Sequence, residues 1–436
     1  MKSNCVKKHY CESCIHLLEE KGEKISPCSY ECLCDLPPDT KISLKCENCG
    51  KEISTCPDEL LMKKNQVSLV KSAIENPKVK VICFIAPSVR ASVTEVFENG
   101  RVRNGQGRLI TALKKLGFDV VFDMNIGADF TVVEEANEFL ERYIQKKNLP
   151  MMTSCCPGWV NYVTKAYKEF IPNLSTCKSP QQIFGALIND YYAKSEKCKS
   201  TDFFVVSIVP CLAKKLEAKT PGINYSQGFD VDAAITTAEV VSLIKDAGID
   251  WDKLEESKFD DFWGDCSGAG AIFGTTGGVM EAVLRSVGDT LDKEVVKTVT
   301  HKLIRGQEGI RKAEIVFGEN KIRVAIVSGI GNAKQLLEDI KSGKEEIDFL
   351  EVMACPGGCV GGGGQPRHEL DKIPFFVKKR AKVLYEYDEK LHDNELMDYY
   401  RKAHNSPTIT KIYNTYLGGV GGEKAKKMLH RKYEDK

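Results

Sequence analysis

The distribution of cysteine constrains this chain more than any other feature of its sequence. Nine of the 18 cysteines fall within the first 56 of 436 residues; they are Cys5, Cys11, Cys14, Cys28, Cys32, Cys34, Cys46, Cys49 and Cys56. Disulfide scaffolds of that density are typical of short secreted chains. Here the start MKSNCVKKHYCESC has no apolar stretch of the kind an export signal needs. We therefore expect a cytoplasmic protein in which this spacing indicates metal or iron–sulfur ligation.

Charge and hydropathy exclude several other classes of protein. The chain has 62 Lys and Arg against 61 Asp and Glu, a net charge of +1, which leaves no single-sign field for nucleic acid or an anionic membrane. The longest apolar stretch, around residues 203–213, is broken by Ser207 and Pro210 and is too short to cross a bilayer. We expect a soluble protein that binds neither nucleic acid nor membrane.

Composition divides the chain into three regions. Residues 1–64 are rich in cysteine and too weakly periodic to build a core, so we expect metal clusters to hold them together. Residues 65–390 alternate short apolar runs with helical patterns, which predicts an α/β fold with parallel sheets flanked by helices. Residues 391–436 are polar with a helical pattern. The predicted strands are VKVICFIAP (79–87), DVVFDM (119–124), LPMMTS (149–154), FFVVSIVP (203–210), RVAIVSG (323–329) and DFLEVMA (348–354).

Four motifs follow these runs directly. They are APSVR (86–90), TSCCPGW (153–159), VPCLAKKLEA (209–218) and EVMACPGGCVGGGGQP (351–366). The carboxyl ends of buried parallel strands are where ligand sites form in α/β sheets. Cys156, Cys211, Cys355 and Cys359 meet the four-cysteine requirement of a [4Fe–4S] cluster, and the glycine run 361–364 lets backbone pass close to a bulky cofactor.

The three cysteine motifs, present in this order, resemble the signatures of the [FeFe]-hydrogenases. The similarity extends from about Cys46 to the C-terminus. It implies a two-lobed catalytic domain with an H-cluster between the lobes, a cubane held by Cys156, Cys211, Cys355 and Cys359. Cys359 would also bridge to a two-iron subcluster that carries CO, cyanide and an azadithiolate. Cys155, which has no cluster to bind, resembles the thiol that passes protons to the bridgehead amine.

The resemblance also assigns residues around the two irons. Lys214, Ser88 and the backbone at Pro87 resemble the groups that hydrogen-bond the cyanides, and Gln181, Phe273 and Met353 those that line the diiron pocket. A buried lysine is favourable only when it is paired with negative charge. Val209 stands where the family usually has Met, which should open the pocket and remove a soft thioether contact.

A buried site of this kind needs a proton route to water. The pattern of residues 128–147 predicts a helix with a capping box at Thr131 and Glu134 and an apolar stripe of Val132, Ala136, Phe139 and Tyr143. Glu135 lies at the edge of the stripe and Glu138 one step nearer solvent. On sequence alone such glutamates are more often solvated. The resemblance implies the relay Cys155, Glu135, Ser175, Glu138, with Arg142 near the exit.

The N-terminal region resembles a ferredoxin-like accessory domain with altered ligands. In CENCGKEISTCP (46–57) Glu52 replaces the third cysteine, and in CESCIHLL (11–18) Leu17 does so. We expect two accessory [4Fe–4S] clusters with rearranged ligation; one cluster plus a zinc site is the alternative. The candidate ligands are Cys11, Cys14, Cys28, Cys32, Cys34, Cys46, Cys49 and Cys56, with Cys5 as a ligand or a spare.

The resemblance implies an enzyme that reversibly interconverts H2 with protons and electrons. Electrons would be exchanged with a ferredoxin-like carrier, and dedicated maturation proteins would install the diiron site. The segment 391–436 resembles the separate small subunit of some relatives. Two other interpretations stay open: an H2 sensor of low turnover, for which Val209 is the hint, and an iron–sulfur assembly scaffold, against which the doubled Cys155–Cys156 argues.

Overall fold

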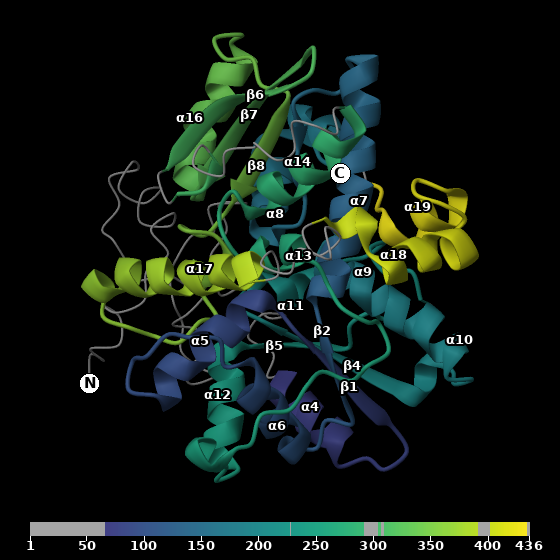
Figure 1. The fold of residues 1–436 in the computed structure, drawn as a ribbon, viewed down its shortest axis with the longest axis vertical. Helices are drawn as coiled ribbons and strands as arrows, with labels where there is room; N and C mark the ends of the chain where they lie inside the picture. Colours follow the sequence, from purple (N-terminus) through teal and green to yellow (C-terminus); the bar gives the residue numbers. More distant parts are fainter. Residues whose placement is uncertain (1–65, 227, 292–303, 307–308, 391–401, 434–436) are drawn as a thin grey trace.

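Two separate four-stranded sheets form the framework of the protein (Figure 1). The computed structural model describes residues 66–226, 228–291, 304–306, 309–390 and 402–433. The first sheet has the order β2-β1-β4-β5, and every neighbouring pair is parallel. Its strands are β1 (Lys80–Ile85), β2 (Val120–Asp123), β4 (Phe203–Val209) and β5 (Ala233–Thr236).

The second sheet has the order β3-β8-β7-β6. Its strands are β3 (Met151–Met152), β6 (Ile310–Phe317), β7 (Asn320–Ser328) and β8 (Phe349–Met353). The pairs β3–β8 and β7–β8 are parallel, whereas β6 and β7 form an antiparallel hairpin at the edge. The α/β fold class predicted from the sequence is therefore confirmed, with one antiparallel strand added.

Each of the six apolar runs contains a strand, but two strands were missed. β5 has only four residues, AAIT, too few for a periodic pattern. In β6, buried and exposed positions are interleaved, because an edge strand has a face open to solvent. Continuous apolar runs are typical of buried central strands, and an edge strand with one exposed face has no such run.

Helices cover both sheets. They are α4 (Gln66–Ile74), α5 (Pro87–Phe97), α6 (Gln106–Leu116), α7 (Asn125–Gln145), α8 (Pro157–Ala166), α9 (Pro180–Leu187), α10 (Ala193–Ser195), α11 (Ala213–Glu217), α12 (Thr237–Asp246), α13 (Gly268–Ile272), α14 (Gly278–Leu291), α16 (Ile330–Lys341), α17 (Ile373–Lys390), α18 (Pro407–Ile412) and α19 (Glu423–Leu429).

Aromatic packing and strand alternation fix these helices on the sheets. Phe84 of β1 and Phe122 of β2, opposite each other in register, both pack on Phe184 of α9. In β8, Phe349 stacks on Phe139 of α7, with 4.8 Å between ring centroids. The next residue, Leu350, belongs instead to the core shared with α8 and α16, because successive strand side chains point to opposite faces.

Helix α7 connects the two sheets, since it follows β2 in sequence and packs on β8 (Figure 1). Its predicted apolar stripe is buried throughout. The predicted capping box is wrong, because α7 begins at Asn125 and both residues are inside the helix. The Thr131 hydroxyl donates to the Gly127 carbonyl, and the Glu134 carboxylate accepts from His430. Thr131 and Glu134 have the residue types and the spacing of a capping box, but neither lies at the start of the helix.

The C-terminal segment lies against α7 and α9 (Figure 1). It contains α18, a π-helical turn at Tyr413–Leu417 and α19, in agreement with its helical pattern. Beyond α19, His430 forms an antiparallel bridge with Cys177. Two backbone hydrogen bonds flank the bridge, from Lys178 N to the Leu429 carbonyl and from Arg431 N to the Thr176 carbonyl. Residues 429–431 are thereby held beside residues 176–178.

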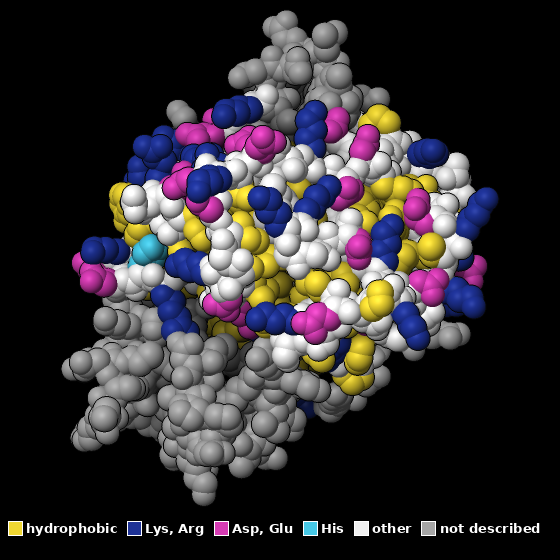
Figure 2. Space-filling view, turned by 90° about the horizontal axis from the view of Figure 1, so that it is seen from below, with side chains coloured by type: hydrophobic (Ala, Val, Ile, Leu, Met, Phe, Trp, Pro, Cys, Tyr) yellow, Lys and Arg dark blue, Asp and Glu magenta, His cyan; other side chains and the backbone are white. Residues whose placement is uncertain are grey.

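The described surface shows mixed charge on the face drawn in Figure 2. Lysines and arginines alternate there with aspartates and glutamates, and neither sign gathers into a patch. Among the helices of the described segments, none has both the length and the apolar character required to cross a membrane.

Candidate metal-cluster site

A cavity lies where the carboxyl ends of β1, β3, β4 and β8 come together. All four sequence motifs reach it, and about 760 Å³ of it is free of protein atoms, counting the part open to solvent. Its lining includes the predicted residues Pro87, Ser88, Cys155, Cys156, Gln181, Val209, Cys211, Lys214, Phe273, Met353, Cys355 and Cys359. Residues more than 270 positions apart in sequence therefore share one site.

Strand ends deliver the four candidate cluster ligands. Cys156 is the N-cap of α8 just beyond β3, Cys211 follows β4, and Cys355 and Cys359 follow β8. All four are partly exposed, and none forms a disulfide with another described residue. The loop carrying the last two is tied to the loop carrying Cys211, because Gly364 N donates to the Pro210 carbonyl at 2.8 Å.

The donor set fits a cluster better than a single ion. Within the described residues, no three Cys, His, Asp or Glu side chains converge on one ion-sized point. A [4Fe–4S] cluster instead takes one cysteine thiolate at each iron, so its ligands surround a volume. Four cysteines lining one cavity have that arrangement, and Cys156, Cys211, Cys355 and Cys359 could hold such a cluster.

Polar groups aimed at the cavity favour an anionic occupant. Helices α5, α8 and α9 each begin there with a proline, Pro87, Pro157 and Pro180, and first-turn N–H groups are polarised positively. Ser88 Oγ and Gln181 Oε1 are buried without a hydrogen-bond partner. Unpartnered buried polar atoms are costly. Ser88 Oγ can donate to an anionic ligand, whereas Gln181 Oε1 only accepts and fits a donor group of the occupant.

Lys214 has two hydrogen-bond partners within the protein itself. Its ammonium donates to Glu217 Oε2 at 2.8 Å and to the Cys155 carbonyl at 3.0 Å. Burial opposes the charged form, but the Glu217 carboxylate overcomes it and raises the pKa of Lys214. Because an ammonium has three N–H groups, a third donor remains for the cavity. Glu217 thus keeps a buried cation at the site.

Glycine 358 allows the loop before Cys359 to fold. Its φ of 88° and ψ of −159° fall in a region that only glycine occupies readily. A Cβ there would lie 2.6 Å from Thr276 N and 2.7 Å from the Thr275 carbonyl carbon. The close approach of two backbone segments behind Cys359 therefore requires a residue without a side chain.

Glu135 is fully buried beside the cavity. Its relative exposure is 0%, and neither carboxyl oxygen has a hydrogen-bond partner of good geometry. Burial, reinforced by the Glu138 carboxylate, raises the pKa of Glu135 to about 8, against smaller opposing contributions from the Ser175 hydroxyl and the Ser154 amide. The solvated interpretation of Glu135 is therefore wrong. Cys155, 8% exposed, has a pKa raised first by burial and then by Glu135.

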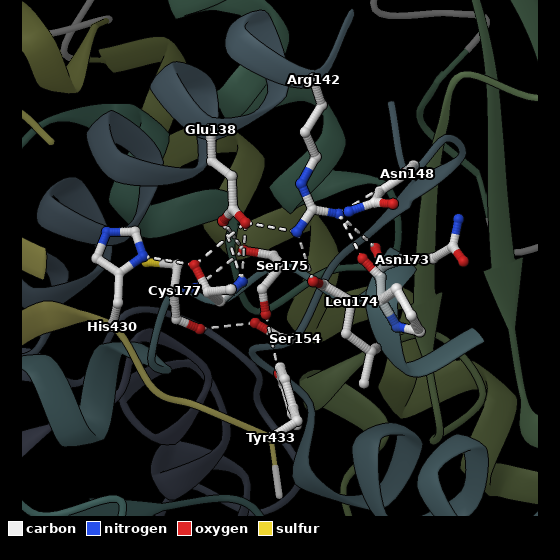
Figure 3. A network of polar contacts seen from close by, with 12 residues as sticks. Glu138, Arg142, Asn148, Ser154, Asn173, Leu174, Ser175, Cys177, His430 and Tyr433 are labelled. Atoms are coloured by element: carbon white, nitrogen blue, oxygen red, sulfur yellow. Dashed lines mark hydrogen bonds and ion pairs between the residues drawn. The ribbon is translucent and has the colours of Figure 1, made fainter. Parts of the chain in front are cut away.

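Hydrogen bonds link the outer members of the predicted relay (Figure 3). Ser175 Oγ donates to Glu138 Oε2 at 2.9 Å, and Arg142 donates to Glu138 Oε1 at 2.6 Å. The Arg142 guanidinium also donates to the carbonyls of Pro172, Asn173 and Leu174. The side chains of Glu138 and Arg142 are each 12% exposed. Direct hydrogen bonds thus join Ser175, Glu138 and Arg142. Cys155 and Glu135 lie near each other, but no hydrogen bond joins them.

Some predicted residues lie elsewhere, and some neighbours were missed. The eight candidate accessory ligands, with Cys5, Leu17 and Glu52, are outside the described residues. Cys83, Cys177 and Cys266 are buried and Cys198 is exposed. Missed cavity residues include Met124, Ala128, Pro157, Pro180 and Gly274. A proline at the first position of a helix that follows a ligand motif was the available signal for two of them.

Family models match nearly the whole described chain. Residues 79–363 match the iron only hydrogenase large subunit, C-terminal domain, and residues 375–436 match the iron hydrogenase small subunit. The first match alone covers more than half of the chain.

Individual proteins agree with these models. The chain is 43% identical over 381 residues to Iron hydrogenase 1 of Clostridium pasteurianum, covering 87% of this chain and 65% of that protein; it thus spans slightly less than two thirds of that relative's length. A structure of apo [FeFe]-hydrogenase HydA1 from Chlamydomonas reinhardtii superposes with a TM-score of 0.72 at 34% identity, covering 84% of this chain and 98% of that one. Cytosolic iron-sulfur assembly component 3 of Bos taurus is 31% identical over 379 residues, 83% of this chain and 76% of that protein.

The order of the strand-end cysteines, their meeting at one cavity and these matches have a single explanation: the chain belongs to the iron-only, or [FeFe], hydrogenase family.

Proposed function

We propose that this chain reversibly interconverts H2 with protons and electrons at an H-cluster. The observation that carries the proposal is that one cavity is lined by the four cysteines Cys156, Cys211, Cys355 and Cys359 together with a fifth thiol, Cys155. A cubane needs four cysteine ligands. The fifth is left to do acid–base work beside the site, and acid–base work is what H2 chemistry needs and simple electron transfer does not.

The cavity residues would hold the cofactor and its polar ligands. Cys156, Cys211, Cys355 and Cys359 would bind the cubane, and Cys359 would also reach the two-iron subcluster. When bound, the H-cluster supplies the metal centre at which H2 is formed or cleaved. Lys214, Ser88 and the amide at residues 87–88 would donate to its anionic ligands. Gln181 would line the diiron pocket with its amide, and Phe273, Met353 and Val209 would exclude water.

Protons would travel along side chains that leave the cavity. Cys155 Sγ would exchange a proton with the cofactor and with the Glu135 carboxyl. From Glu135 the proton would pass to Ser175 Oγ and on to Glu138, whose partner Arg142 lies nearest solvent. The raised pKa of Glu135 suits a group that both accepts and releases a proton near neutral pH.

Electrons would enter through residues 1–64. We propose two accessory [4Fe–4S] clusters in that region, fed by a ferredoxin-like carrier, with one cluster plus zinc as the alternative. Dedicated maturation proteins would install the two-iron subcluster. Iron and zinc analysis of anaerobically purified protein, with and without co-expressed maturation proteins, distinguishes these compositions: two accessory clusters predict no stoichiometric zinc.

Two other functions make different predictions for the same preparation. The likeness to an iron–sulfur assembly component favours a scaffold, which would show no infrared bands of bound CO and cyanide after maturation. An H2 sensor, for which Val209 on the cavity wall is the hint, would show the bands but evolve H2 slowly. Strong bands together with rapid H2 evolution from reduced viologen would support the enzyme and exclude both.

Val209→Met tests the departure from the family pattern. Val209 is 1% exposed and faces the cavity with Phe273 and Met353. A thioether contact contributes about 0.3–1.5 kcal/mol, so we expect the rate of H2 evolution to rise roughly twofold to tenfold with iron content unchanged. Val209→Leu, which fills the space without sulfur, is the matched control. Equal rates for both variants would show that volume, and not the thioether, is what matters.

A further inference from the structure

A second hydrogen-bonded chain leaves Glu138 toward the C-terminal segment (Figure 3). The Thr176 hydroxyl lies 3.1 Å from Glu138 Oε1 and 2.7 Å from His430 Nδ1. On the other side of the imidazole, Nε2 lies 3.0 Å from Glu134 Oε2. Two side chains, Thr176 and His430, thus connect two glutamates of α7, and the proposed relay uses neither of them.

The fold brings these groups together and keeps them in place. Glu134 and Glu138 are four residues apart in α7 and so lie on one helical face. The bridge between Cys177 and His430 sets residue 430 beside residue 176, although they are 254 positions apart in sequence. The His430 side chain is 11% exposed and that of Glu134 is fully buried. The imidazole therefore has little room to leave its two partners.

Counting hydrogens shows that this chain has two states. Glu134 accepts from the Gly421 amide, so as a carboxylate it takes the hydrogen of His430 Nε2. If His430 is neutral, its Nδ1 is a bare acceptor, and the single hydrogen of the Thr176 hydroxyl points to it. If His430 is protonated, Nδ1–H donates to Thr176 Oγ1, and the hydroxyl hydrogen is released to Glu138.

We propose that His430 is a positioning residue that switches the Thr176 hydroxyl between itself and Glu138 as it gains and loses a proton. The inference rests on the proposed proton route and deepens it. Protonated His430 gives the Glu138 carboxylate one donor more, and deprotonation withdraws that donor. The donor set of the outermost relay carboxylate therefore depends on whether His430 carries its second proton.

Other charged groups face this chain but do not replace the switch. Arg142 on α7 donates to Glu138 Oε1 at 2.6 Å, and its guanidinium stays charged whatever the protonation state of His430. On the C-terminal segment, Tyr413 faces Glu134, and burial followed by that carboxylate raises the pKa of Tyr413 well above its ordinary value. Cys177 faces the same carboxylates, and burial followed by Glu135 and Glu134 raises the pKa of its thiol.

Two further cations belong to the strands of the bridge. Lys178 is buried, and burial lowers its pKa to about 8, with Arg431 contributing in the same direction. Lys178 Nζ donates to the Met428 carbonyl at 2.8 Å, and the Arg431 side chain stacks on Tyr433. Both therefore have other partners, and His430 is the group that contacts Thr176.

Infrared and NMR titration of the matured holoenzyme tests the switch directly. The carboxylate band of Glu138 is identified by its loss in Glu138→Gln, and the ¹⁵N signals of His430 by their loss in His430→Gln. In a titration from about pH 5 to 8, we expect the band to shift with the same midpoint as the His430 signals. A His430 that keeps one protonation state over this range, or a band that does not move when it titrates, would overturn the proposal.

Matched variants separate the switch from a merely structural contact. Thr176→Val keeps the shape of residue 176 and removes its hydroxyl, whereas Thr176→Ser keeps the hydroxyl. The shift should vanish in Thr176→Val and in His430→Gln and should persist in Thr176→Ser. Persistence of the shift in Thr176→Val would show that the Thr176 hydroxyl does not carry it.

Turnover is the second readout. The ratio of H2 evolution rates at pH 6 and pH 8 should change about tenfold in Thr176→Val and His430→Gln, as expected for one hydrogen bond to a charged group, and should be kept in Thr176→Ser. A wild-type protein that makes no H2 but shows the coupled infrared shift would refute the proposed function alone. Normal H2 evolution without the coupled shift would refute the switch alone.

Discussion

Glu135→Gln should slow H2 evolution by roughly 10²–10⁴-fold, the usual contribution of a positioned acid–base group, and should make the protein more stable at neutral pH. Glu135 is fully buried with both carboxyl oxygens unpartnered. An amide cannot pass a proton on, so the proposed route from Cys155 to Ser175 ends at residue 135. The same amide cannot ionise in the unfolded chain either, so the cost of keeping the buried carboxyl protonated at neutral pH disappears.

The pH dependence of that stability gain has a definite sign. The folded-state pKa of Glu135 is raised from 4.5 to about 8, so between these values the folded chain binds the proton and the unfolded chain releases it. Stability therefore falls as pH rises from about 4.5 to 8, by about 1.4 kcal/mol per pH unit. At pH 7 the penalty is roughly 3 kcal/mol, and Glu135→Gln removes it.

Thermal midpoints of matured wild type and variant at pH 5, 7 and 8 measure this effect. The difference should be near zero at pH 5 and grow with pH. Glu138→Gln is the matched control: it also interrupts the route, but it loses the ion pair with Arg142 at 2.6 Å and should be destabilised. A Glu135→Gln midpoint that exceeds wild type by the same amount at every pH would contradict a buried, protonated Glu135.

Gly358→Ala should prevent assembly of the cluster site. The new Cβ would lie 2.6 Å from Thr276 N. Because that atom belongs to the backbone, no side-chain rotation can relieve the clash. Thr276 N itself donates to the Gly357 carbonyl at 3.1 Å, so moving the loop also breaks that hydrogen bond. Adding the strain of a glycine-only conformation, about 1–3 kcal/mol, we expect Cys359 to be displaced and the CO and cyanide bands of matured protein to be lost.

Gly343→Ala separates strain from contact. Gly343 also has a positive φ, +71°, but a Cβ there meets nothing within 4 Å. It should cost about 1 kcal/mol and leave iron content and infrared bands as in wild type. Full infrared intensity in Gly358→Ala, at wild-type iron content, would show that the loop before Cys359 tolerates a side chain and that its glycine is not required.

The sequence predicted the site better than it predicted the surrounding structure. The motifs with Cys156, Cys211 and Cys355 could be placed because each follows a strongly apolar run, and strand ends of parallel sheets converge. Glu135 could be placed relative to Glu138 because helical spacing is fixed. By contrast, the start of α7 was missed, since its N-cap is Met124, whose side chain makes no capping hydrogen bond.

Contacts between distant segments were beyond the reach of sequence patterns. The pairing of Thr176 with His430 depends on how the chain end docks on residues 176–178, and no periodicity in either segment encodes it. The environment of Lys214 and Glu217 was only partly predictable from the sequence. Glu217 lies three residues after Lys214, but only the packing shows that Glu217 is buried and that Lys214 reaches the cavity.

The most direct measurement is H2 evolution from reduced viologen by fully matured, anaerobically purified protein, beside Cys155→Ala and a matched control, Cys83→Ala. Cys83 is also a fully buried thiol, but it lies in β1 away from the cavity lining. The account predicts rapid evolution by wild type and Cys83→Ala and a loss of at least about 10²-fold in Cys155→Ala, with CO and cyanide bands present in all three. Equal rates in wild type and Cys155→Ala, or negligible evolution by wild type with those bands present, would contradict it.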